Sequence, residues 1–185
     1  MRHNDRMNLN AALVGLWLLL AAPAAAQSKC TFPGKATTCR SPNGQWRLEW
    51  QEAKESTPHL LLAWRVGRGG VIGGVNLLSF YRSIDVLWSP QSTYIAVNDH
   101  YGSSDTNLLV VELFSTSILV VDTDFQRMLK QRRYYGSGHR LFNPLRWQTD
   151  SKLVFEVKED DAEPGIEPRG VFIFDARSRT VKRTN

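Results

Sequence analysis

One short segment, DHYGSSD at residues 99–105, gathers the residue types of a hydrolytic site. A histidine takes the proton of a serine hydroxyl and an aspartate orients that histidine, and the segment holds Asp99, His100, Ser103, Ser104 and Asp105. The partners of such a triad normally come from distant segments that meet in space, and the chain lacks the G-x-S-x-G motif of serine hydrolases. We therefore predict that the protein is not an enzyme, with a hydrolase that uses His100 as the alternative.

Other kinds of chemistry have weaker sequence signals. The glycine-rich segment VGRGGVIGG (66–74) departs from the dinucleotide-binding pattern because Ile72 stands in the place of its third glycine. The acidic segment 158–168 lacks the spacing of a calcium loop, and two cysteines without a second pair do not make a zinc site. We expect no cofactor, no metal and, without interleaved basic and aromatic residues, no nucleic-acid partner.

The first 26 residues have the pattern of a secretory signal peptide. A positive start is followed by the apolar run AALVGLWLLLAAPAAA (11–26), which ends in small residues before the polar Gln27. This run is short for a membrane-spanning helix, so we expect cleavage after Ala26, export to the periplasm and no membrane span in the mature chain. Residues 27–185 are then a single domain, in which Cys30 and Cys39 form a disulfide because the compartment is oxidising.

Three segments of the chain repeat a turn followed by a strand. They are SPNGQWRLEW (41–50), WSPQSTYIAVND (88–99) and WQTDSKLVFEV (147–157), with Trp88 and Trp147 directly before their turns. After each turn, apolar residues fall at every second position, as in a strand: Trp46, Leu48 and Trp50; Tyr94 and Ala96; Leu153, Phe155 and Val157. The copies are separated by roughly the length of a β-propeller blade, and each is followed by further predicted strands.

A helix is predicted between the second and third copies, at about 124–134. Thr123 and Gln126 fit a capping box, and Phe125, Met128 and Leu129 share one helical face. The run SILVVD (117–122) before it is predicted as a strand. The helix therefore interrupts the strand pattern between two units.

The segment WSPQSTYIAVND resembles the repeat of TolB-like and WD40-like propellers, which typically reads W-S-P-D-G-x-x-I-A-F. The pattern differs at Gln91-Ser92 and at Gln148-Thr149. The resemblance implies an all-β fold, an open or partial propeller-like array of about three four-stranded units with one inserted helix. Three units are fewer than the four to eight blades of closed propellers and leave sheet edges open, so we expect a terminus or the helix to cover these edges, or oligomerisation, or a partner bound there.

A small exported β array is also similar to the periplasmic immunity proteins that neutralise type VI secretion peptidoglycan amidases. That resemblance implies a serine-bearing loop that enters the cleft of an amidase with a Cys-His site. The matching loop here is His100, Tyr101, Gly102, Ser103, Ser104 and Asp105. A protein-binding inhibitor of such an effector is the predicted function, and a generic TolB-like envelope binding module is the alternative.

Overall fold

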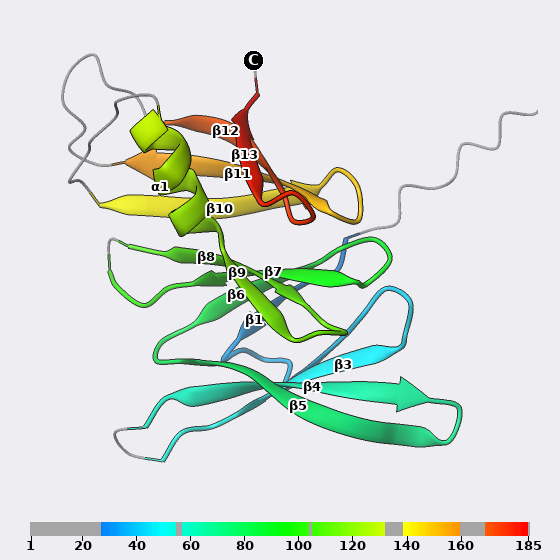
Figure 1. The fold of residues 1–185 in the computed structure, drawn as a ribbon. Coiled ribbons are helices and arrows are strands. Elements are labelled where there is room, and N and C mark those ends of the chain that lie inside the picture. Colours follow the sequence, from blue (N-terminus) through cyan, green and yellow to red (C-terminus); the bar gives the residue numbers. More distant parts are fainter. Residues whose placement is uncertain (1–26, 55–56, 104, 132–138, 160–168, 185) are drawn as a thin grey trace, which may run out of the picture.

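The computed structural model describes residues 27–54, 57–103, 105–131, 139–159 and 169–184. In this part of the chain, three antiparallel sheets are stacked one on another and a single helix lies beside them (Figure 1). The predicted signal peptide, 1–26, lies outside the described residues. No helix among the described residues is long and apolar enough to cross a membrane.

Each sheet follows the chain order of its strands. Sheet 1 contains β2 (Thr38–Arg40), β3 (Trp46–Gln51), β4 (His59–Gly67) and β5 (Gly70–Phe80). Sheet 2 contains β1 (Lys29–Phe32), β6 (Ile84–Trp88), β7 (Tyr94–Asp99), β8 (Asn107–Glu112) and β9 (Ser117–Val120). Sheet 3 contains β10 (Arg140–Trp147), β11 (Lys152–Glu159), β12 (Gly170–Asp175) and β13 (Thr180–Arg183).

The prediction of an all-β fold with three units is confirmed, with one difference at the N-terminus. The segment before the first repeat contains two strands, and they join different sheets. β1 pairs with β6, so sheet 2 gains a fifth strand, whereas β2 pairs with β3 in sheet 1. The chain therefore crosses from sheet 2 to sheet 1 before the first repeat begins, and this ties the two sheets together.

The third repeat is shifted by one residue relative to the alignment predicted from sequence. The turns close with Ser41 N–H donating to Trp46, Ser89 N–H to Tyr94, and Gln148 N–H to Lys152. The third turn is thus one residue shorter, and Lys152, not Leu153, occupies the place of Tyr94. Because side chains alternate along a strand, this shift moves Leu153 and Phe155 to the opposite face from the one assigned to them.

This shift explains how the third sheet is buried. Trp147 pairs with Leu153 just as Trp88 pairs with Ile95, and in both sheets these side chains point toward the preceding sheet. One apolar core lies between sheets 1 and 2 and a second lies between sheets 2 and 3. The indole Nε1 of Trp88 donates to Cys39 Sγ at 3.1 Å, and that of Trp147 donates to the Leu87 carbonyl at 3.1 Å.

Hydrogen bonds join the turns of the three repeats along one side of the stack. Asn43 Nδ2 donates to the Gln91 carbonyl at 2.9 Å, and the Gln91 N–H donates to Asp150 Oδ1 at 2.9 Å. The second turn holds Ser92 at a φ of 63°, where the first has Gly44 at 70°. Matching positions thus carry the contacts between neighbouring units, which confirms that the three segments are structural repeats.

The two outer faces of the stack carry charged residues where the inner faces carry buried apolar ones, so no further sheet in the described part of the chain packs on them. On sheet 1, Arg40 stands where the other two sheets have a buried tryptophan, and Arg47 and Glu49 pair there at 3.4 Å. On sheet 3 the alternate positions of β11 on the outer face include Lys152 and Glu156. Terminal repeats of stacked arrays need polar outer faces in the same way. The fold is therefore an open stack, not a closed propeller.

The predicted inserted helix begins earlier than expected. α1 spans Val121–Gln131, so the predicted strand over 117–122 ends at Val120 and the capping-box residues Thr123 and Gln126 lie inside the helix. Two aspartates in the first turn favour a helix start there. Phe125 and Leu129 are buried in the core between sheets 2 and 3, which confirms the predicted apolar face. Residues 132–134 lie outside the described part.

The predicted Cys30–Cys39 disulfide is present and joins β1 of sheet 2 to β2 of sheet 1. Its loop is short, with a sequence separation of 9. We expect the double substitution Cys30→Ser and Cys39→Ser to lower the free energy of unfolding by about 2–3 kcal/mol, because the unfolded chain gains freedom. Urea denaturation with and without reductant measures this. A midpoint in the variant equal to that of the oxidised wild type would contradict it.

Candidate functional site

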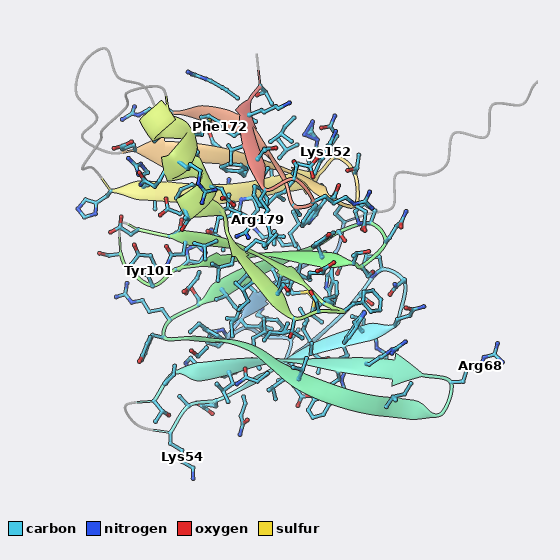
Figure 2. All side chains as sticks on the ribbon, viewed as in Figure 1. Lys54, Arg68, Tyr101, Lys152, Phe172 and Arg179 are labelled. Atoms are coloured by element: carbon cyan, nitrogen blue, oxygen red, sulfur yellow. A yellow bond between two sulfur atoms is a disulfide. The ribbon has the colours of Figure 1, made fainter. Side chains whose placement is uncertain are left out.

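The predicted binding loop joins β7 to β8 on the edge of the stack where α1 lies (Figure 1). Tyr101 projects from it and is 48% exposed (Figure 2). Ser103 is also exposed, and Ser104 lies outside the described residues. Loops held by a rigid sheet are common places for binding residues.

The start of the loop is held by an anchor from sheet 2. The His100 N–H donates to the Ser83 carbonyl at 3.0 Å, and His100 Nε2 lies 3.3 Å from Asp85 Oδ2. Asp85 also accepts a hydrogen bond from the Thr31 hydroxyl at 2.6 Å and pairs with Lys29 at 3.5 Å. Strands β1 and β6 therefore fix the position of the first loop residue.

The end of the loop is held by a second anchor from sheet 3. Asp105 accepts the Arg140 N–H at 3.2 Å through Oδ1, and its Oδ2 lies 2.8 Å from His139 Nδ1. The buried Thr106 hydroxyl both donates to the Phe142 carbonyl at 3.1 Å and accepts the Phe142 N–H at 2.7 Å. Because the two anchors come from different sheets, the loop bridges them with both ends fixed.

A small polar pocket of about 160 Å³ lies between this loop, α1 and β10. Asp122 and Asp105 line it together with Tyr101, Gln126 and Arg140. Burial raises the pKa of Asp122, and the nearby Arg140 opposes that effect. Arg140 is itself buried and lies 3.3 Å from Glu159, so its charge is balanced inside the protein. The pocket suits a group that donates hydrogen bonds to carboxylates.

The same surroundings raise the pKa values of Tyr101 and Asp99. Burial raises the pKa of Tyr101, and the charges of Asp105, Asp122 and Asp99 add to this rise. Burial also raises the pKa of Asp99, against the opposing effect of His100. The Tyr101 hydroxyl therefore stays protonated at neutral pH and is available as a hydrogen-bond donor.

The histidine and the aspartates of the loop do not pair with one another as a triad would require. His100 pairs with Asp85, whereas Asp105 pairs with His139. Among the described residues, no serine hydroxyl hydrogen-bonds to the His100 ring, whose one ring hydrogen bond goes to Asp85. The described residues contain no group of three or more His, Cys, Asp or Glu side chains that could hold a metal ion. The absence of catalysis, cofactor and metal stays a prediction.

The backbone at Gly102 does not require a glycine. A Cβ at this position would meet Asp105 at 3.5 Å, an ordinary contact distance, and its φ is not in the left-handed region. An alanine therefore fits this position.

Sequence reasoning missed the residues that hold the loop in place. Asp85, Thr31, Thr106, His139 and Arg140 belong to strands or strand ends of four different sequence regions, and no local motif marks them. The sequence offered one usable signal, the position of Asp105 at the end of a polar loop directly before a strand. Its partners depend on how sheets 2 and 3 stack.

Comparison with known proteins gives no further guide to function. No protein-family model matches the chain, and no curated protein sequence matches it.

Asp85 gives the first anchor a pH dependence that can be measured. Burial alone would raise its pKa, but the Thr31 hydroxyl, Lys29 and His100 together lower it below its usual value. A carboxyl with a lowered folded-state pKa contributes stability that is fully present above its unfolded value of about 3.9 and is lost as the pH falls through the folded value.

We therefore expect the stability of the wild type to fall more steeply below about pH 4 than that of Asp85→Asn. Lys29→Ala should give an intermediate slope, because one of the stabilising charges is gone. Urea denaturation at a series of pH values tests this. Parallel pH profiles for wild type and Asp85→Asn would show that Asp85 does not contribute to acid sensitivity.

Proposed function

We propose that this chain is an exported, periplasmic inhibitor that binds a peptidoglycan-cleaving amidase and occludes its active site with the loop 100–105. The observation that supports this proposal best is the pair of anchors, which fix both loop ends while the tip stays exposed. A preorganised loop loses little conformational entropy when it binds.

The residues at the tip have distinct roles in the proposal. Tyr101 supplies a large, partly exposed ring of the type that anchors interfaces. Ser103 is small enough to enter a narrow cleft, and its hydroxyl can donate to a thiolate or imidazole of a Cys-His site. The adjacent pocket, with Asp105 and Asp122, would receive a donor group from the rim of the enzyme. Substrate is then excluded by occupancy of the cleft.

The export part of the proposal rests on the leader pattern and the disulfide. The apolar run over 11–26 is typical of a secreted chain, and the Cys30–Cys39 bond fits an oxidising compartment. Peptidoglycan-cleaving enzymes act in this same compartment, so inhibitor and target would meet there.

The test begins with capture of the partner from periplasmic extract on immobilised mature protein. The captured enzyme is then purified and its cleavage of peptidoglycan is followed with increasing amounts of the inhibitor. We expect inhibition to reach completion near equimolar protein, and Tyr101→Ala to weaken it. Undiminished cleavage at a large excess would contradict the proposal. Capture of an envelope-assembly protein would favour the generic binding module, and cleavage by the pure protein alone would favour the hydrolase.

A further inference from the structure

A second surface, which shares no residue with the loop 100–105, carries an apolar cleft. This cleft has a volume of about 280 Å³ and lies between sheet 1 and the turn that joins β8 to β9. Trp46, Ala63 and Val75 form its sheet 1 wall, and Phe114 packs edge-on against Trp46 at 5.8 Å. Pockets for small molecules usually measure about 300–1,000 Å³, so this cleft is small for such a ligand. Its size and open side suit a side chain that belongs to a longer molecule.

Exposed apolar side chains gather around the cleft. Ile72 is 70% exposed and Phe114 is 60% exposed, and both line it. Ile118 and Val120 on β9 are 42% and 39% exposed, and they alternate on the face of sheet 2 that is turned toward sheet 1. Large apolar groups that cluster on a surface mark sites of association more reliably than isolated ones.

The cleft borders a free strand edge. β5 is the last strand of sheet 1, and in the described part of the chain its backbone hydrogen bonds go to β4 alone. Its sequence, GVIGGVNLLSF, contains no charged residue and no proline, the features that normally protect an edge from pairing. Figure 1 shows this long strand on the outside of the stack. A strand added here would complete the pairing of β5.

The charge at the cleft identifies the kind of segment that fits. Arg65 is the charged residue among those that line the cleft, it is exposed, and it forms no ion pair with the described residues. Arg68 lies nearby at the tip of the β4–β5 hairpin (Figure 2). A second copy of this chain docked through the same cleft would bring the arginines of both copies together. An occupant with an acidic group would be attracted instead.

We propose that the free edge of β5 and the adjacent cleft bind an extended segment of a partner protein that carries both apolar and acidic residues. The segment adds a strand to sheet 1, so its backbone pairs with β5. An apolar side chain enters the cleft against Trp46 and Phe114, and an acidic side chain pairs with Arg65. This surface does not include the loop 100–105, so the two proposals can fail separately.

The experiment uses the mature protein and two acetylated peptides of about ten residues, a length matched to β5. Because Arg65 lies on the same face of sheet 1 as the cleft, valines and charged residues occupy every second position of each peptide, with serine or threonine between them. One peptide carries aspartates and the other carries lysines at the same positions. We expect the acidic peptide to bind more tightly in calorimetry. Hydrogen exchange should then slow within residues 70–80, since the free amides of β5 gain partners.

Charge-reversal variants distinguish this proposal from nonspecific hydrophobic binding. Arg65→Glu should weaken binding of the acidic peptide by about tenfold or more and strengthen binding of the basic one. Ile72→Asp, at a largely exposed position, should also weaken the acidic peptide. Lys54→Glu is the matched control, because Lys54 lies at the opposite end of sheet 1 (Figure 2) and should leave affinity unchanged.

Three results would overturn the proposal. The first is equal binding, or no binding, of the two peptides. The second is exchange protection that falls outside β5. The third is a dimer of the protein alone whose formation protects β5, since a second copy would then be the occupant.

Discussion

Trp88→Ala should lower the free energy of unfolding by about 3–5 kcal/mol. Trp88 is fully buried between sheets 1 and 2, and its indole Nε1 donates to Cys39 Sγ. The substitution removes a large apolar side chain, leaves a cavity that two stacked sheets cannot easily close, and deletes a hydrogen bond. Trp88→Phe should cost less, because most of the ring volume is kept.

Trp147→Ala should have an effect of similar size, since Trp147 holds the equivalent place between sheets 2 and 3. It is 3% exposed, donates to the Leu87 carbonyl and stacks on Tyr94 at 6.1 Å. Tyr81→Ala is the control, because Tyr81 is 68% exposed and its loss should change stability by less than about 0.5 kcal/mol. Denaturation midpoints that stay unchanged in both tryptophan variants would mean that the units do not depend on these contacts.

The repeats could be recognised from sequence because they rest on local chemistry. A turn followed by alternating apolar residues is visible in the 88–99 segment without any structure, and the three units follow from its copies. The disulfide was also predictable, because the chain contains two cysteines and they leave a single intramolecular pairing. These features depend on residues that are close in sequence or few in number.

The register of the third unit could not be read in the same way. Lys152 takes the place of Tyr94 because the third turn is one residue shorter, and turn length is set by hydrogen bonds that close it. An apolar pattern alone fits either alignment, since Leu153 and Phe155 alternate in both. Likewise, the sequence did not show that Arg40 and Glu156 lie on the outer faces of the stack, because that depends on which sheets are neighbours.

For the candidate site, the sequence identified the loop and not its supports. His100 and Asp105 were selected as neighbours in one polar segment, but each pairs with a residue from another strand or sheet, Asp85 and His139. Pairing between sheets depends on tertiary packing, which a single sequence does not display. The helix start at Val121 was misplaced for a related reason. Valine favours strands by its own propensity, but here Val121 packs into the core between sheets 2 and 3 from the first turn of α1.

The second large effect is expected in partner binding. If the proposed function holds, replacing Ser103 and Ser104 together with arginine should weaken the affinity for the captured partner by at least about a hundredfold. A narrow cleft accepts small serines and rejects two long, charged side chains. The fold should survive, because Ser103 is exposed and the anchors through Asp105 and Thr106 are unchanged.

Two control variants test whether the loss of affinity arises because the arginines cannot enter the cleft of the partner. Gly102→Ala adds a methyl group that the fold accommodates, so its thermal midpoint should match the wild type, and it serves as a stability control for changes within the loop. Ser178→Arg places an arginine in the turn between β12 and β13, outside the proposed contact, and should bind normally. A comparable loss in Ser178→Arg would point to a general effect of added charge.

The most direct test of the proposed function is therefore the dissociation constant of the captured amidase for wild type and for the Ser103→Arg, Ser104→Arg variant. Both proteins are first shown to have the same thermal midpoint. Insertion of the loop into the active-site cleft predicts a loss of about a hundredfold or more, together with loss of inhibition. Wild-type affinity in the folded variant would contradict loop insertion.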